Sequence, residues 1–577
     1  MLRLVHFLKP YKKSIIAVFI FTFIQTLGTL YIPTLTAEIV NSGVAKGDIS
    51  YIMKIGLFML VTAGITGIVA VLGSKLSADV SSGFAKNIRE AMFMKAQEFS
   101  MNDFNKIGTA SIITRTTSDV TLIGQTTIML LQMLLPAPVM TIAGLFLAFS
   151  KDKVMALIIV ATMMAFLLVA LLLGKMVIPL FKLIQVKMDN INRILRERII
   201  GVRVIRAFNR EKYEKNRIDA AAADYADNAI KINKIIAALL PLVMMIINLG
   251  VIFILWIGGK KVLNGNMQIG DIMAMIEYCF LILYFLIMGV MMFMYIPRAQ
   301  VCADRINEVL DTTTEITDGK SKALERKEYA HLEFRNVTFQ YPNAEEPVLN
   351  NLSFESKAGE ITAIIGGTGS GKSTIASLIP RFFEIQNGSI MVDGIDIRNM
   401  SQKELRDKIG LVPQKAFLFS GTISENIRYG KNDATQEEIE HAAKVAQAHD
   451  FITNLEQGYE SYVAQGGNNL SGGQKQRLSI ARALIRRPEI YIFDDSFSAL
   501  DFKTDAKLRK ALKSETGSST VIIVAQRIST IMDAHRIIVL EDGKIVGMGR
   551  HEELIKSCDV YKQIAASQLS EAELAEQ

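Results

Sequence analysis

The chain has 577 residues, of which 50% are hydrophobic and only 21% are charged. This length allows about three to five ordinary domains, and the composition excludes an intrinsically disordered chain. The three cysteines, Cys279, Cys302 and Cys558, give neither metal-ligand spacing nor a disulfide framework, which excludes a cystine-rich secreted protein. The formal net charge of +7 suits either a nucleic-acid-binding protein or a membrane protein. The distribution of Lys and Arg along the chain decides between these two classes.

Six long apolar stretches occupy the first half of the chain. Crossing about 30 Å of hydrocarbon takes about 20 helical residues, and each stretch is long enough to do so. They lie near residues 14–40, 53–76, 126–149, 154–180, 235–258 and 270–296. The sequence therefore predicts an all-α membrane domain, residues 1–310, that crosses the bilayer six times.

The distribution of Lys and Arg predicts the orientation of these spans. The segment before the first span and the connections 77–125 and 181–234 together hold 22 of these residues, whereas the three alternate connections hold 5. Cytoplasmic segments carry the excess of positive charge, so both termini are predicted to be cytoplasmic and no nucleic-acid partner is expected. Each long connection is helical in pattern, and a helix going out and back would reach about 35 Å into the cytoplasm.

The second half has the pattern of a soluble α/β domain. After a polar linker, 311–328, strand patterns alternate with helical patterns through residues 329–577. The expected strands are 331–341, 360–365, 490–493 and 520–525, and residues 536–546 are expected to form a hairpin that turns at Asp542-Gly543.

A glycine-rich segment after the second of these strands carries the strongest chemical signal. It reads Gly366-Gly367-Thr368-Gly369-Ser370-Gly371-Lys372-Ser373 and is followed by Thr374 and a helical pattern. The segment fits G-x-x-x-x-G-K-[ST], in which backbone N–H groups and a helix N-terminus bind phosphates. Lys372 is expected to neutralise phosphate oxygens, and Ser373 and the strand-terminal Asp494 to hold Mg²⁺. ATP and Mg²⁺ are therefore the predicted ligands.

A second loop, Leu470-Ser471-Gly472-Gly473-Gln474, lies about 100 residues after the phosphate-binding loop and shortly before Asp494. With its motifs in this order, the whole chain resembles a half-transporter of the ATP-binding-cassette (ABC) family, of the exporter type. The resemblance implies an all-α six-helix transmembrane domain fused to an α/β P-loop ATPase domain. It also implies ATP-driven transport by two paired halves, with each ATP held between the phosphate-binding loop of one half and the second loop, called the signature loop, of the other.

The resemblance assigns roles to further positions of the chain. Tyr341 would stack on adenine, Gln414 would contact Mg²⁺ and the membrane domain, and Asp501 would belong to a loop that crosses the interface between the halves. Short coupling helices are expected in the two long connections, within 108–119 and 197–208.

Two positions depart from the family pattern. Asp495 stands where the family usually has a glutamate that orients the attacking water, and its carboxylate would fall about 1.5 Å short, a displacement that can cost about a hundredfold in rate. Gln526 stands where the family has a histidine near the γ-phosphate, and an amide can neither take a proton nor carry charge. Because the signature loop is complete, the sequence favours a heterodimer in which this chain holds ATP at a slow, degenerate site and its partner supplies the glutamate and histidine.

The substrate is predicted only as a class, namely amphipathic or hydrophobic compounds exported across a bacterial plasma membrane. Glu277, in the sixth span, is a candidate contact for cationic substrates, because charges inside spans are costly. Solvation near the outer interface, or pairing with Lys260 or Lys261, explains it equally well. A homodimer with an adequate Asp495, a lipid or peptide exporter and an ATP-gated channel remain open alternatives.

Overall fold

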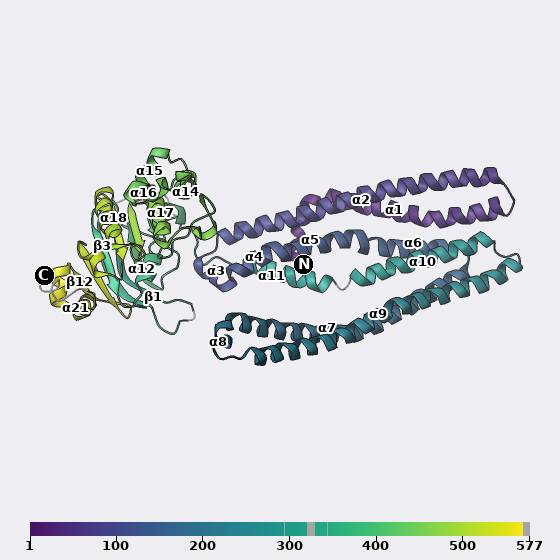
Figure 1. The fold of residues 1–577 in the computed structure, drawn as a ribbon. Helices are drawn as coiled ribbons and strands as arrows, with labels where there is room; N and C mark the ends of the chain where they lie inside the picture. The colour runs from purple at the N-terminus through teal and green to yellow at the C-terminus, as the bar shows by residue number, and fades with distance from the viewer. Residues whose placement is uncertain (293–294, 320–328, 343, 569–577) are drawn as a thin grey trace. The chain divides into compact units, whose positions relative to one another are not determined.

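The structure, a computed structural model, describes residues 1–292, 295–319, 329–342 and 344–568 (Figure 1). The chain divides into two compact units. The first unit comprises Met1–Gln97 and Thr109–Asp311, and the second comprises Glu98–Gly108 and Thr312–Gln577. Residues 320–328 of the predicted linker lie outside the described residues.

Six helices of the described chain are long and apolar enough to cross a membrane, which confirms the predicted number of spans. They cover Arg3–Val44, Ile49–Gln97, Thr109–Lys151, Lys153–Ile200, Glu211–Leu263 and Ile269–Asp311. With lengths of 42 to 53 residues, each is about twice as long as a bilayer requires. The helices therefore continue well beyond the apolar segment that each contains.

Local breaks divide some of these long helices into shorter elements. Single π-helical turns occur at η2 (Ile39–Val44), η3 (Arg115–Asp119) and η4 (Leu130–Leu134), and the chain begins with the 3₁₀ helix η1 (Leu2–Tyr11). The α-helices of the first unit are α1 (Lys12–Glu38), α2 (Ile49–Gln97), α4 (Thr109–Thr114), α5 (Val120–Met129), α6 (Pro136–Lys151), α7 (Lys153–Ile200), α8 (Val202–Ala207), α9 (Glu211–Leu263), α10 (Ile269–Met292) and α11 (Ile296–Asp311).

Helices α1 and α2 run side by side, and so do α7 and α9 (Figure 1). Side chains such as Met155 and Tyr278 are buried between helices. Large apolar side chains also cover the outside of the unit; Leu60 is 71% exposed and Leu171 is 67% exposed. A continuous apolar exterior of this kind is stable in contact with lipid rather than with water.

The second unit contains a mixed six-stranded sheet in the order β12-β11-β3-β10-β9-β6, a four-stranded antiparallel sheet in the order β2-β1-β4-β5, and a small two-stranded sheet β7-β8. The strands are β1 (Leu332–Phe339), β2 (Leu349–Ser356), β3 (Ile361–Gly366), β4 (Asn387–Val392), β5 (Ile395–Asp396), β6 (Ile409–Val412), β7 (Gly421–Thr422), β8 (Tyr462–Val463), β9 (Ile490–Asp494), β10 (Thr520–Val524), β11 (Arg536–Glu541) and β12 (Lys544–Gly549). All four predicted strands are present, with ends within two residues of those expected.

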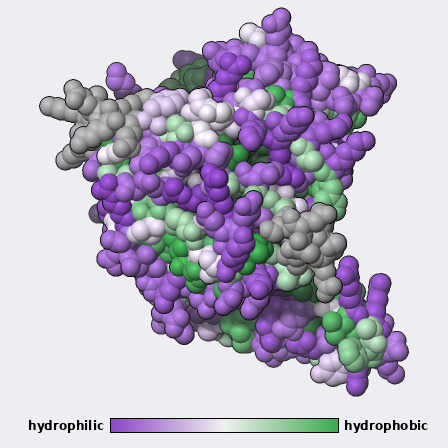
Figure 2. All heavy atoms as spheres, turned by 90° about the vertical axis from the view of Figure 1, so that its left-hand side faces the viewer, coloured by the Kyte–Doolittle hydropathy of each residue, from purple (hydrophilic) through white to green (hydrophobic). Residues whose placement is uncertain are grey.

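The α-helices among residues 329–568 are α12 (Lys372–Leu378), α13 (Gln402–Asp407), α14 (Ile423–Arg428), α15 (Gln436–Val445), α16 (His449–Thr453), α17 (Gly472–Leu484), α18 (Phe502–Glu515), α19 (Ile528–Ile531), α20 (His551–Ser557) and α21 (Asp559–Ala566), with the 3₁₀ turns η5 (Gly458–Glu460) and η6 (Gln465–Gly467). Of these helices, α12, α13, α17, α20 and α21 contact strands of the six-stranded sheet. Alternate residues of β3 enter different cores: Ala363 and Ile365 pack into one, and Ile364 into the other. The side of the second unit seen in Figure 2 is mostly hydrophilic, as expected for a domain in water.

The predicted hairpin is present, with Asp542 and Gly543 at φ of +43° and +72° between β11 and β12. This conformation suits the Asp-Gly sequence of a tight hairpin turn.

The two expected coupling helices have different outcomes. Helix α8 lies within 197–208, as predicted. The other short helix lies earlier in the chain than the predicted range 108–119. Helix α3 (Met101–Ile107) precedes Gly108, and Thr109 already begins the next long helix. Gly108 has a φ of +82°, which ends α3 and redirects the chain. Helix α3 belongs to the second unit, although α2 and α4 on either side of it in sequence belong to the first.

Candidate functional site

Three neighbouring parallel strands bring the predicted nucleotide-binding residues to one edge of the six-stranded sheet. Strand β10 pairs in parallel with β3 on one side and with β9 on the other. The phosphate-binding loop follows β3, Asp494 ends β9, and Gln526 comes shortly after β10. Because the carboxyl ends of parallel strands share an edge, these residues meet although they are far apart in sequence.

The phosphate-binding loop depends on glycine at two positions. Gly369 and Gly371 have φ of +86° and +96°, a region that L side chains rarely adopt. A Cβ added at Gly369 would meet no atom within 4 Å, so this side of the backbone is open to an approaching group. Helix α12 begins immediately afterwards at Lys372, which directs its N-terminus toward the loop.

The Lys372 side chain bends back over this loop. Its Nζ donates hydrogen bonds to the carbonyl oxygens of Gly366 at 2.9 Å and Gly367 at 2.6 Å. Burial lowers the pKa of Lys372 from its ordinary value, and the nearby charges of Asp495 and Asp494 oppose this shift. The loop therefore places one cation among backbone groups that suit phosphate oxygens.

Ser373 and Asp494 form the predicted pair of Mg²⁺ ligands. The Ser373 hydroxyl donates to Oδ1 of Asp494 at 3.0 Å. Burial raises the pKa of Asp494 above its ordinary value, the hydrogen bond from Ser373 lowers it, and the charge of Asp495 raises it further. A hydroxyl and a carboxylate oxygen are hard ligands of the kind that Mg²⁺ prefers, and a divalent cation would favour the charged form of this buried carboxylate. The residues present therefore fit Mg²⁺ bound together with ATP.

The two departures from the family pattern lie in direct contact. Oδ2 of Asp495 accepts a hydrogen bond from Nε2 of Gln526 at 2.9 Å and another from Nε2 of Gln414 at 3.1 Å. Asp495 is only 9% exposed and has a φ of +47°. A single carboxylate oxygen is thus held by two amides, neither of which can accept a proton.

Sequence reasoning missed Gln568, which follows α21. Its Nε2 donates to the carbonyl oxygen of Gln526 at 2.8 Å, and its Oε1 accepts from the backbone N–H of Ile528 at 2.8 Å. The N–H of Ile528 is one of the unpaired donors at the start of α19, so Gln568 fixes the backbone of the loop that carries Gln526. No motif marks Gln568, because its partners lie about 40 residues away in sequence.

Tyr341 and Thr374 meet beside the start of α12. The Tyr341 hydroxyl lies 3.2 Å from Oγ1 of Thr374, and its ring packs edge-on against Phe339 and Phe383, with centroid distances of 4.8 and 5.3 Å. The structure thus places the predicted adenine-stacking ring next to the helix that begins at the phosphate-binding loop.

The signature loop forms the start of α17. The Ser471 side chain accepts from the N–H of Gln474 at 3.3 Å, and Oε1 of Gln474 accepts from the N–H of Ser471 at 2.9 Å. This reciprocal cap explains the local sequence without reference to a ligand. Leu470 is half-buried, while Ser471 and Gly472 are exposed. Gly473 lies close to the neighbouring loop, since an added Cβ would be 3.2 Å from the carbonyl oxygen of Ala499.

Asp501 caps α18 in a similar way. Its carboxylate accepts from the N–H of Thr504 at 2.9 Å and from the Thr504 hydroxyl at 2.7 Å. These hydrogen bonds lower the pKa of Asp501. Within this chain, Asp501 therefore has a structural role at the helix N-terminus.

Glu277 lies on α10 as an exposed side chain. In the described chain, both lysines considered as its partners have other contacts: Lys261 pairs with Asp152 at 2.5 Å, and Lys260 lies 4.8 Å from the ring centre of Trp256. Pairing with these lysines therefore does not account for Glu277, and its contact with substrate stays a prediction.

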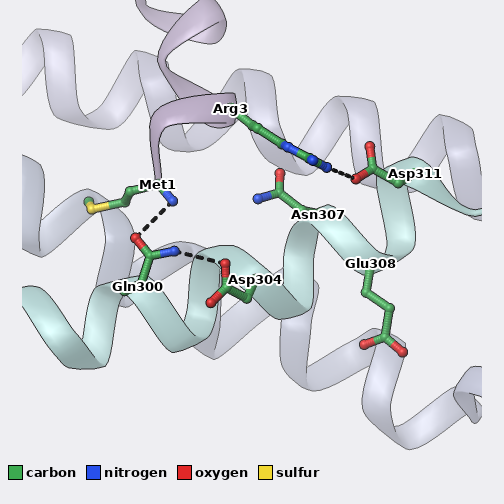
Figure 3. A pocket seen from close by; sticks show the side chains of 7 residues that line it. All are labelled: Met1, Arg3, Gln300, Asp304, Asn307, Glu308 and Asp311. Carbon is green, nitrogen blue, oxygen red and sulfur yellow. Dashed lines mark hydrogen bonds and ion pairs between the residues drawn. The ribbon is translucent and has the colours of Figure 1, made fainter.

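A separate cavity of about 460 Å³ lies in the first unit, between the start of the chain and α11 (Figure 3). Its lining consists of Met1, Arg3, Gln300, Asp304, Asn307, Glu308 and Asp311. The Arg3 guanidinium pairs with Asp311 at 2.6 Å, and the N-terminal amine donates to Gln300 at 3.1 Å (Figure 3). These contacts attach the start of the chain to α11, and none of the lining residues belongs to the nucleotide-binding site.

Comparisons with known proteins agree with this geometry. Residues 15–286 match the family described as ABC transporter transmembrane region, and residues 349–498 match the family described as ABC transporter. An uncharacterized ABC transporter ATP-binding protein of Mycobacterium tuberculosis is 38% identical over 97% of both chains. An ATP-dependent lipid A-core flippase of Desulfotalea psychrophila is 33% identical over 96% of both chains. A solved bacterial Atm1-family ABC exporter with ATP bound has a TM-score of 0.80 and 26% identity, with 97% of this chain and 99% of that chain covered.

The chain belongs to the ABC transporter family, as an exporter-type half-transporter in which a six-helix transmembrane region precedes the ATPase domain. It is a multi-pass membrane protein whose second unit binds ATP and whose ATPase activity is coupled to transport.

Proposed function

We propose that this chain is one half of a heterodimeric exporter of amphipathic and hydrophobic compounds, and that its own ATP site hydrolyses ATP slowly. One observation carries the proposal. A complete phosphate-binding loop is combined with Asp495, whose carboxylate is held by the amides of Gln414 and Gln526. Such a site retains every group that binds ATP but lacks the glutamate and histidine that the family usually places at the γ-phosphate.

The roles of this chain's residues follow from their chemistry. Lys372 and the backbone of the phosphate-binding loop bind phosphate oxygens, and Tyr341 packs against the base. Ser373, Gln414 and Asp494 hold Mg²⁺, which when bound neutralises charge on the phosphates. Asp495 orients water poorly because its side chain is one methylene shorter than a glutamate and one of its oxygens is occupied by two N–H groups.

The asymmetry of the motifs supports a different partner chain. The signature loop keeps its capped helix start, with exposed Ser471 and Gly472 available to a facing surface. In the proposed heterodimer, this loop completes the partner's ATP site, where the partner supplies the glutamate and histidine. Most hydrolysis then occurs at the partner's phosphate-binding loop, while ATP bound by this chain stabilises the closed pair.

The proposed location is a bacterial plasma membrane, with both termini and residues 329–577 in the cytoplasm. The excess of Lys and Arg in the connections 77–125 and 181–234 supports this orientation. A lipid substrate is the second candidate, because one relative acts as a lipid A-core flippase. In that case we expect a homodimer of this chain to move a lipid between leaflets by the same ATP-driven cycle.

The native mass of the complex tests the heterodimer directly. We expect a tag on this chain to recover a second, different half-transporter from native membranes in a one-to-one ratio. This chain weighs 64.0 kDa, and we expect a partner of similar size. Native mass spectrometry gives the mass of each subunit and therefore shows whether one kind of chain or two are present. A complex that contains two copies of this chain and no other would contradict the proposal and would assign all turnover to Asp495.

The replacement Glu277→Gln tests the substrate class. We expect efflux of the cation ethidium to fall by about fivefold, because a partly screened charge pair is worth about 1 kcal/mol. Efflux of a neutral amphipathic dye of similar size should not change, and this dye serves as the control. Unchanged ATP-driven uptake of both dyes into inverted membrane vesicles would remove Glu277 from the substrate path.

A further inference from the structure

The linker that follows α11 is built into the second unit over its described part. The carbonyl oxygen of Thr317 accepts from the Arg381 guanidinium at 3.2 Å, and Oδ1 of Asp318 accepts from the N–H of Gln402 at 3.0 Å. Ile316, between these contacts and α11, is only 4% exposed. Residues 312–319 are therefore a packed part of the nucleotide-binding unit and not a free tether.

The same linker holds the short helix α3. Nδ2 of Asn102 donates to both carboxylate oxygens of Glu315, at 2.7 and 2.8 Å, and Nζ of Lys106 lies 3.3 Å from Oε1. Asn102 is 7% exposed, whereas the side chain of Glu315 is 45% exposed, so a buried amide meets a carboxylate at the surface. Hydrogen bonds to a charged acceptor are about twice as strong as those between neutral groups.

Helix α3 is itself a well-capped element. Ser100 and Asp103 form a reciprocal capping box at its start, and both side chains are buried. An external contact to Asn102 therefore acts on the whole helix rather than on one flexible side chain.

We propose that Glu315 is a positioning residue that couples the nucleotide-binding unit to the membrane helices by clamping α3 to the linker. Helix α3 joins the end of α2 at Gln97 to the start of the next long helix at Thr109. A displacement that α3 follows therefore acts directly on both of these helices. The Asn102–Glu315 contact makes α3 move together with the linker. This proposal depends on the family's ATP-driven transport and not on the proposed heterodimer.

The amide and the carboxylate of the Asn102–Glu315 contact can be exchanged between the two positions with little change in side-chain size. Asn102→Asp places two carboxylates face to face, and Glu315→Gln leaves one acceptor oxygen but removes the charge. In the double variant Asn102→Asp/Glu315→Gln, the new Gln amide can donate to the new carboxylate, and Lys106 remains one helical turn from position 102. Asn105→Asp, the same chemical change at an exposed position of α3, is the matched control.

Hydrogen exchange of the full complex in nanodiscs measures the clamp. We expect Asn102→Asp to speed exchange of the α3 amides by about tenfold, which corresponds to the loss of one charge-assisted hydrogen bond. Glu315→Gln should have a smaller effect of the same sign, and the double variant should restore exchange to within about twofold of wild type. Asn105→Asp should behave as wild type.

A second measurement separates coupling from simple stabilisation. In Asn102→Asp, the change in exchange of α2 and α4 on addition of ATP and Mg²⁺ should be about threefold smaller, while ATP hydrolysis per complex stays within about twofold. The double variant should recover the full response. Unaltered α3 exchange in Asn102→Asp, or a double variant no better than Asn102→Asp alone, would overturn the proposal. An equal decrease in ATP hydrolysis and in the ATP-induced change in exchange of α2 and α4 would also overturn it, because Asn102 would then only stabilise the fold.

Discussion

Replacing Ser471 by aspartate should lower ATP hydrolysis by the assembled transporter by at least about a hundredfold, as expected when a group that stabilises developing charge becomes a repulsive one. In the paired arrangement implied by the family, the signature loop faces the γ-phosphate held by the other half. A carboxylate at this exposed position would repel that phosphate. The fold of the loop should survive, because aspartate caps a helix N-terminus as well as serine does.

Ser401→Asp provides the matched control for this replacement. Ser401 caps α13 by accepting from the N–H of Glu404 at 3.2 Å, in the same way as Ser471 caps α17. The control variant should hydrolyse ATP at the wild-type rate, and thermal unfolding should show equal stability of the two variants. Wild-type hydrolysis by Ser471→Asp would mean that this loop does not face a γ-phosphate.

Restoring the family residues at the degenerate site should have a comparably large effect in the opposite direction. Asp495→Glu combined with Gln526→His extends the carboxylate by one methylene and replaces the amide at its Oδ2 with an imidazole. We expect hydrolysis at this chain's own phosphate-binding loop to rise by about a hundredfold, the factor that a misplacement of about 1 Å can cost.

The Ser471→Asp background makes this rise measurable. In the proposed heterodimer, that background silences the partner's site only, so the two restoring changes should bring back ATP hydrolysis in the purified complex. In a homodimer, the same background silences both sites and no recovery should occur. No rise in either the wild-type or the Ser471→Asp background would contradict the explanation of slow turnover by Asp495 and Gln526.

Asp495→Asn serves as the complementary control. It removes the charge but keeps the size of the side chain, and hydrolysis by the complex should stay within about a factor of two of wild type. Near-total loss of activity would show instead that Asp495 is an adequate catalytic carboxylate.

Local signals in the sequence were sufficient for the class of protein and for most of its elements. Long apolar stretches predict membrane helices because crossing hydrocarbon demands length and hydrophobicity of the segment itself. The phosphate-binding and signature loops are contiguous, so their glycines, Lys372 and Ser471 are visible without knowledge of the fold. The hairpin at Asp542-Gly543 is equally local, because its turn depends on two adjacent residues.

Contacts between distant segments were decided by the tertiary structure alone. The sheet order β12-β11-β3-β10-β9-β6 differs from chain order, and it brings Gln414 and Gln526 to one oxygen of Asp495 from sequence separations of 81 and 31 residues. Neither amide identifies this partner by spacing, because strand order depends on packing of the whole sheet.

The same reason explains the displaced helix α3 and its clamp. The predicted position of the short helix was wrong because the capping box at Ser100 and the turn at Gly108 set its ends, and the family spacing alone does not show them. Asn102 and Glu315 lie 213 residues apart, and only the folding of the linker onto the second unit brings an amide and a carboxylate together. The sequence alone thus determined the motifs that bind ATP and the segments that cross the membrane, whereas the tertiary structure decided which side chains restrain the carboxylate of Asp495 and which attach α3 to the linker.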